Sequence, residues 1–292
     1  MNKRVFFALT ILLMPFLGNP NLYAAEANAG ETNAVAAAPD ASHAAVVSDL
    51  NALITRINEK ILQQKHSETD YTDNIKEFDA LLAKHKNADV EDRVNIIMQK
   101  GLIYMQVLED PVKALPIFQQ IKTDYPSIQL NGDTDGFLAA IKEMADKKTI
   151  RDALVGVPFP DFNEKDLEGK DLSVAKYKGK VVLLDFWATW CPPCVMAVPE
   201  IQKVYNKYHD NGFEVVGISL DVDKGDLEKF VKQRKMLWPQ VFAGNRFDNK
   251  LAIKYGVAFA PTTFLVGRDG KVIKQLMGTG DLDQEIASAL KQ

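Results

Sequence analysis

The sequence predicts an α/β domain with a mixed sheet, preceded by an all-helical region. From about residue 49 to 148, apolar residues recur at three- and four-residue spacing, which is the period of amphipathic helices. After about residue 153, short apolar runs alternate with helical segments, as expected where helices pack on a sheet. The length of 292 residues also fits two domains better than one.

The first region is expected to form a series of helices. They cover about residues 49–62, 73–86, 90–108, 111–126 and 136–148. Ser48 is the expected N-cap of the first helix. Pro111 stands at the start of the fourth, where its missing N–H leaves no hydrogen bond unmade.

Part of this region resembles the tetratricopeptide repeat. The small–aromatic–Ala–Phe–Pro signature of that repeat matches Gly101, Tyr104, Ala114, Phe118 and Pro126. The match needs one extra residue in the turn, and a regular period of about 34 residues is not present. The resemblance implies stacked helical hairpins, whose surface either binds a protein partner or only packs and spaces.

The second region is expected to alternate strands and helices. A hairpin with its turn at 168–169 comes first. Strands are then expected at 181–187, 213–222, 238–242, 261–267 and 271–278, and helices at 191–209, 224–235, 249–256 and 282–290. We therefore assign a helical domain to residues 49–150 and an α/β domain to residues 151–292.

The first 24 residues have the pattern of a secretory signal peptide. Lys3 and Arg4 precede an apolar core at 5–17, and small residues such as Ala24 then provide cleavage positions. An uncleaved membrane anchor is the alternative, but the apolar core is shorter than the roughly 20 residues of a spanning helix. We expect cleavage and export to a bacterial periplasm, with a flexible, Ala-rich leader at 25–48 that is helical at most in parts.

Composition argues against two classes of protein. Because 47% of the residues are apolar and 25% are charged, the chain has enough apolar material for a core and is not expected to be disordered. The net charge is −4 and no long basic run occurs, so nucleic-acid binding is not expected.

Both cysteines of the chain, Cys191 and Cys194, stand in the stretch FWATWCPPC. A Cys-x-x-Cys after a buried strand and at the start of a helix is typical of a redox-active dithiol. Because a helix N-terminus favours negative charge, the pKa of Cys191 should fall and its thiolate should attack disulfides. Cys194, one turn further along, should then attack the mixed disulfide and release the substrate.

Other interpretations of the two cysteines are weaker. A zinc site needs about four ligands, and the four histidines form no cluster that would complete one, so no metal site is expected. No histidine follows Cys194, which argues against covalent haem. A purely structural disulfide that closes a two-residue loop would restrict the unfolded chain very little.

The segments KGKVVLLDFWATWCPPC and AFAPTTFLVGRDGKV resemble the thioredoxin superfamily and, within it, the exported TlpA-like thiol:disulfide oxidoreductases. The resemblance covers about residues 155–292 and implies a thioredoxin-like fold, no cofactor, protein disulfides as substrates and the reducing direction. It also implies that Pro261 is a cis-proline beside the active site and that the backbone of Ala260 pairs with the substrate. Since the chain has no further cysteines, such a reductant needs an external electron donor in the membrane.

Asp185 interrupts the apolar strand VVLLDFW six positions before Cys191, where an unpaired carboxylate is unfavourable. By the same resemblance, an acid at this position manages the proton of the resolving thiol. We therefore expect a raised pKa for Asp185 and a role in deprotonating Cys194. A strand-end acid satisfied by backbone or water is the alternative. Some family members carry a glutamate where this chain has Ala197, which leaves Asp185 to act alone or changes the reactivity.

The three tryptophans are expected in different places. Trp187 should pack beneath the dithiol, and Trp190 should cover the dithiol in part and offer an apolar surface to a substrate peptide. Trp238 is expected in the core.

Two other functions stay open. Peroxiredoxins, which are relatives of similar fold, use a Pro-x-x-x-Thr-x-x-Cys pattern, and here Leu184 and Ala188 occupy its Pro and Thr positions. A thiol-dependent peroxidase is therefore disfavoured. In the other alternative, the helical region binds a partner and the redox domain is accessory.

Overall fold

The computed structural model describes residues 41–63, 65, 67–277 and 281–292, so the signal peptide expected at 1–24 lies outside the described residues. The chain divides into two compact units between Ala145 and Asp146, a boundary that falls inside one long helix. Among the described helices, none combines the length and the apolar character needed to span a membrane.

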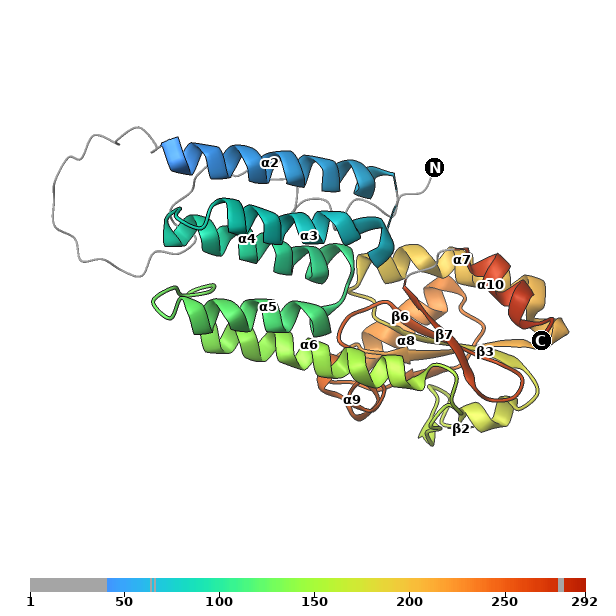
Figure 1. Cartoon of the computed structure of the whole chain (residues 1–292). Coiled ribbons are helices and arrows are strands. Elements are labelled where there is room, and N and C mark those ends of the chain that lie inside the picture. The colour runs from blue at the N-terminus through green and yellow to red at the C-terminus, as the bar shows by residue number, and fades with distance from the viewer. Residues whose placement is uncertain (1–40, 64, 66, 278–280) are drawn as a thin grey trace. The chain divides into compact units, whose positions relative to one another are not determined.

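The first unit consists of helices joined by short turns. Their bounds are α2 Ala41–Leu62, α3 Glu68–Lys84, α4 Val90–Leu102, α5 Pro111–Asp124 and α6 Thr134–Leu154. Figure 1 shows α2 to α5 stacked side by side in chain order. Every helix expected from the periodicity of this region is present. The expected and observed bounds differ only at the ends of the helices.

The first helix begins earlier than the sequence predicted. α2 starts at Ala41 and not after an N-cap at Ser48, so residues 41–48 are helical where a flexible leader was expected. Packing explains the difference, because Val46 is 1% exposed and belongs to the same core as Leu50. The rest of the predicted leader, 25–40, lies outside the described residues.

The end of α4 contains a π-helical turn, η3 (Ile103–Val107). The N–H of Leu108 donates to the carbonyl oxygen of Ile103 at 3.1 Å, which is the i→i−5 bond of that geometry. Such a turn accommodates one extra residue, but the extra residue of the tetratricopeptide signature was expected further along, in the turn at residues 110–111. The resemblance to that repeat itself stays a prediction.

Gly101 of α4 packs against the ring of Phe118 of α5. A methyl group at residue 101 would lie 2.4 Å from Cε1 of Phe118, and the ring is fully buried, so it cannot swing into solvent. We expect Gly101→Ala to destabilise the helical unit by about 1–2 kcal/mol despite the better helix propensity of alanine. Urea unfolding followed by circular dichroism measures this change. Phe118→Leu should reduce the loss, and an equal loss in both backgrounds would contradict the expectation.

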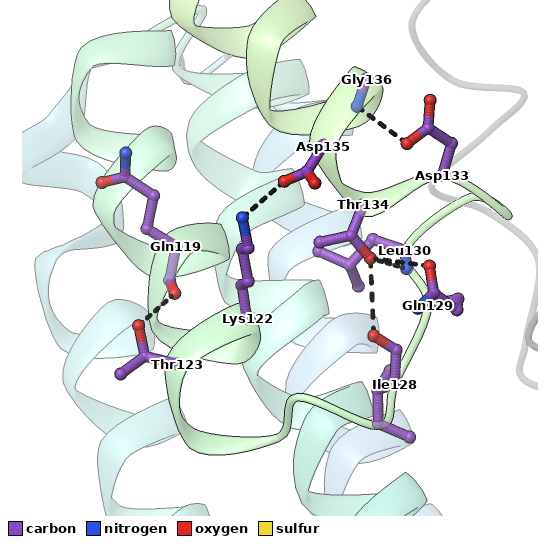
Figure 2. Close-up of polar contacts among 10 residues, drawn as sticks. All are labelled: Gln119, Lys122, Thr123, Ile128, Gln129, Leu130, Asp133, Thr134, Asp135 and Gly136. Atoms are coloured by element: carbon purple, nitrogen blue, oxygen red, sulfur yellow. Dashed lines mark hydrogen bonds and ion pairs between the residues drawn. The ribbon is translucent and has the colours of Figure 1, made fainter.

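The turn between α5 and α6 is held by side chains at the start of α6 (Figure 2). The Oγ1 of Thr134 accepts a hydrogen bond from the N–H of Leu130 at 2.9 Å, and the Asp133 carboxylate accepts one from the N–H of Gly136 at 3.0 Å. Lys122 on α5 pairs with Asp135 at 2.5 Å. These contacts fix the length of the connection and cap the first turn of α6.

The second unit is a mixed sheet covered by helices. Its strands are β1 Glu164–Lys165, β2 Asp171–Leu172, β3 Val181–Trp187, β4 Phe213–Ser219, β5 Gln240–Phe242, β6 Thr262–Val266 and β7 Val272–Met277. Its α-helices are α7 Pro192–Tyr208, α8 Lys224–Arg234, α9 Lys250–Lys254 and α10 Leu282–Ala289. The strand order is β5-β4-β3-β6-β7, with β3, β4 and β5 parallel and β6 antiparallel to both of its neighbours. This is the thioredoxin-like fold that the sequence predicted.

β3 lies at the centre of this sheet and is buried on both faces. On one face Phe186 packs against Tyr255, which ends α9, and on the other Trp187 contacts Phe230 of α8. Figure 1 shows α7 and α10 together on one side of the sheet. Only a short connection separates the end of β3 at Trp187 from the start of α7 at Pro192. Side chains in this connection are therefore held between two rigid elements.

Candidate functional site

The two cysteines form a disulfide at the N-terminus of α7. Cys191 is the N-cap of the helix, and its sulfur accepts a hydrogen bond from the backbone N–H of Cys194 at 3.3 Å. Pro192 and Pro193 occupy the first helical turn, where no N–H donor is needed. The same N–H and the helix dipole are the features from which a stabilised thiolate on Cys191 is expected in the reduced protein.

The connection before Cys191 is tied to the end of β4 by a buried carboxylate. Asp221 is 2% exposed and accepts hydrogen bonds from the N–H of Thr189 at 3.0 Å and from its hydroxyl at 2.7 Å. The hydroxyl of Ser219 donates to the other oxygen at 2.7 Å. Asp221 therefore fixes the residues that lead into the dithiol. Asp221 was not predicted from the sequence, although its place at the end of a parallel strand beside β3 was a usable signal.

Removing the Asp221 carboxylate should destabilise this connection. Asp221→Ala leaves one N–H and two hydroxyl donors without their acceptor, and each unsatisfied buried group costs about 1–3 kcal/mol. We expect a loss of about 2–4 kcal/mol in the free energy of unfolding, measured by chemical denaturation of the oxidised protein. Asp221→Asn keeps an oxygen acceptor and should lose less. If both variants were as stable as the wild type, the hydrogen bonds to Asp221 would not contribute to the stability of the fold.

The peptide bond between Ala260 and Pro261 is cis, as the resemblance implied. The sulfur of Cys191 lies 3.5 Å from the backbone carbonyl oxygen of Ala260. The structure therefore places Cys191 and Ala260, which are far apart in the sequence, next to each other. The role of Ala260 and Pro261 in binding a substrate stays a prediction.

Asp185 is buried at the centre of the sheet, with an exposed fraction of 4%. Burial alone raises the pKa of its carboxyl to about 7, which agrees with the raised pKa expected from the sequence. No hydrogen bond or ion pair joins this carboxyl to another described residue. Because side chains alternate along a strand, Asp185 shares its sheet face with Trp187, which is the face that α8 covers.

The burial of the tryptophans agrees with the sequence prediction, whereas the position of Trp187 and Trp190 relative to the dithiol stays a prediction. Trp187 and Trp238 are 1% and 3% exposed, whereas Trp190 is 41% exposed. The guanidinium of Arg246 lies 4.9 Å from the centre of the Trp190 ring, and the Phe247 ring meets it edge to face at 6.1 Å. Arg246 and Phe247 were not predicted from the sequence, because no local pattern marks them and only the fold places them beside Trp190.

The glutamate of some relatives has no close substitute on α7. Ala197 is 7% exposed, and Glu200 pairs with Lys203 at 3.5 Å on the half-exposed side of the helix. Within the described residues, no group of three or more His, Cys, Asp and Glu side chains is arranged to hold a metal ion.

Comparisons with known proteins match the second unit of the chain. A model of the AhpC/TSA family matches residues 155–275. The chain is 37% identical over 142 residues to the thiol-disulfide oxidoreductase ResA of Bacillus anthracis, covering 48% of this chain and 78% of that protein. It is 38% identical over 137 residues to the protein of the same name from Geobacillus thermodenitrificans, covering 46% and 77%.

Two solved structures are also similar to part of the chain. A thiol:disulfide interchange protein from a Bacteroides species is 29% identical with a TM-score of 0.43, and the match covers 47% of this chain and 91% of that one. A thiol:disulfide interchange protein from Chlorobium tepidum is 27% identical with a TM-score of 0.42, covering 46% and 96%.

Proposed function

Because the chain belongs to the family of ResA-type thiol-disulfide oxidoreductases, we propose that it is an exported enzyme that reduces disulfides of protein substrates with its Cys191–Cys194 dithiol. The position of the Cys191 sulfur carries this proposal. That sulfur caps the N-terminus of α7 and lies beside the Ala260 carbonyl, so a thiolate there is stabilised and faces a backbone that a substrate chain can pair with.

In the first step, the Cys191 thiolate attacks one sulfur of the substrate disulfide. A bond forms between Cys191 and that sulfur, the substrate S–S bond breaks, and the leaving substrate thiolate takes up a proton. Trp190, Ala260 and Pro261 form the proposed contact surface for the substrate. Trp190 offers a half-exposed ring, with the Arg246 guanidinium over the ring and Phe247 meeting it edge to face.

In the second step, the thiol of Cys194 loses its proton to Asp185 and attacks the Cys191 sulfur. The Cys191–Cys194 disulfide forms, the mixed disulfide breaks, and two electrons have passed to the substrate. A carboxyl with a pKa of about 7 is suited to accept a proton near neutral pH. An external thiol donor, which we place in the membrane, must then reduce the disulfide again, because the chain has no other cysteine.

The direction of transfer is tested by the reduction potential of the pair. After equilibration in glutathione buffers, we expect a midpoint more reducing than about −200 mV, within the range of about −270 to −120 mV known for this fold. A midpoint near −120 mV would make the protein an oxidant instead.

A thiol-dependent peroxidase is the second candidate, because the matched family model is that of AhpC/TSA. The residue three positions before Cys191 is Ala188, which is fully buried and has no hydroxyl to offer a peroxide. We expect hydrogen peroxide to be consumed no faster than by a pair of free thiols, in contrast to rapid reduction of a peptide disulfide.

The helical unit is proposed to serve as a surface for a protein partner.

A further inference from the structure

One row of the central sheet holds two buried polar side chains separated by a glycine. Asp185 of β3 is in register with Gly217 of β4, and Gly217 is in register with Gln240 of β5. Register partners in a sheet point to the same face. Asp185 and Gln240 are 4% and 2% exposed, so both side chains are removed from water.

The amide of Gln240 lies over the glycine. A methyl group at residue 217 would lie 1.9 Å from Oε1 of Gln240 and 2.8 Å from its Nε2. A side chain at residue 217 would displace this amide, and the side chain of Gln240 extends across β4 toward β3.

Trp187 fixes which way this amide faces. The indole N–H of Trp187 can only donate, and it donates to Oε1 of Gln240 at 2.9 Å. The amide nitrogen of Gln240 must then face elsewhere. It is buried and has no hydrogen-bond partner among the residues that the structure describes.

The buried carboxyl of Asp185 supplies the acceptor that this nitrogen lacks. Its oxygens also have no partner among the described residues. Neighbouring strands are about 4.8 Å apart, so the amide above Gly217 lies next to Asp185 in the same row of one sheet face. No direct hydrogen bond joins the two groups, so one bridging water is the contact that can satisfy both. Buried polar groups in native proteins are almost always satisfied, and buried waters are a common way of doing so.

We propose that Gln240 is a positioning residue for Asp185, and that its amide N–H donates across Gly217 to the Asp185 carboxylate through one buried water. The donor favours the ionised carboxylate, which opposes the effect of burial. The inference rests on the proposed role of Asp185 in deprotonating Cys194. In that role, Gln240 keeps the carboxyl able to accept a proton at neutral pH, and Trp187 holds the amide in the donating orientation.

The titratable groups near Asp185 are few. Its register partners Gly217 and Thr263 do not titrate, and no charged group on any packed element contributes to its pKa. On α7, the thiol of Cys194 becomes titratable when the disulfide is reduced. The oxidised protein therefore gives the cleaner measurement.

The test is a carboxyl-carbon NMR titration of Asp185 in the oxidised protein. In Gln240→Met, which keeps the length of the side chain and removes the donor, we expect the ionisation constant of Asp185 to fall about tenfold. An unchanged titration would overturn the inference. The second readout needs no variant: in the wild-type protein, the side-chain amide signals of Gln240 should shift with the same inflection as Asp185, and pH-independent signals would also overturn it.

A double substitution separates this role from a structural one. In the reduced protein, Gln240→Met should shift the pH–rate profile of the resolving step upward by about one pH unit, and it should have no such effect when residue 185 is Asn. Equal effects in both backgrounds would mean that Gln240 only packs. If Asp185→Asn alone leaves the profile unchanged, the proposed role of Asp185 fails, whereas the NMR titration still decides on the contact with Gln240.

Discussion

Replacement of Cys194 by serine is expected to turn the protein into a covalent trap for its substrates. Cys191 keeps its place at the N-terminus of α7, so its thiolate still attacks a substrate disulfide. The hydroxyl of serine cannot break the mixed disulfide, and turnover stops after one event. Incubation with a disulfide-bonded peptide should give a one-to-one adduct that mass spectrometry detects and dithiothreitol removes.

Cys191→Ser is the matched control for this trap. The remaining thiol belongs to Cys194, the third residue of α7, which does not occupy the helix cap, the position that favours a thiolate on Cys191. We expect no adduct and no reductase activity above background. Adducts that form equally well on both variants would show that the two sulfurs are equivalent, and the assignment of attacking and resolving cysteines would be wrong.

The dithiol was accessible to prediction because its signals are local. An apolar strand, two cysteines at the right spacing and two prolines tolerated only at a helix start all stand within residues 181–194. The cis bond at Pro261 was not available from those residues. It came from the family resemblance of a segment some 70 positions away, and only the fold places its carbonyl 3.5 Å from the Cys191 sulfur.

Other parts of the site depend on tertiary structure and carry no sequence signal. Gln240 is one polar residue in a short strand. Its importance follows from the register of β3, β4 and β5, which places Gly217 between Asp185 and Gln240. Arg246 reaches Trp190 from a different connection. The early start of α2 has a similar cause, because burial of Val46 outweighs a composition typical of a flexible leader.

Asp185→Asn is expected to make the oxidised protein more stable at neutral pH. The pKa of Asp185 is about 7 in the folded protein and near 3.8 in an unfolded chain, so between these values the folded state holds a proton that the unfolded state releases. The contribution of Asp185 to the stability of the wild type therefore falls as the pH rises from about 4 to about 7. The difference in pKa corresponds to as much as about 4 kcal/mol.

Asparagine has nearly the shape of a protonated aspartate and no charge to desolvate. The variant and the wild type should therefore be about equally stable at pH 4, and the variant should be the more stable at pH 8. Chemical denaturation across this range measures the effect. Asp283→Asn is a suitable control, because Lys207 at 2.8 Å lowers the pKa of Asp283 and the sign of its contribution is opposite. Parallel stability profiles for wild type and Asp185→Asn would contradict the prediction.

The same variant should resolve the mixed disulfide more slowly, by about 10²-fold near pH 7, because general base catalysis typically contributes at least that much. A gain in stability together with a loss in rate would distinguish a catalytic group from a structural one. A residue that holds the sheet together lowers stability when it is removed, whereas Asp185 destabilises the sheet at neutral pH. The presence of Asp185 in a strand that is otherwise apolar is then explained by its role in accepting the proton of Cys194. An Asp185→Asn variant that is more stable and equally fast would show that the carboxyl has no such function.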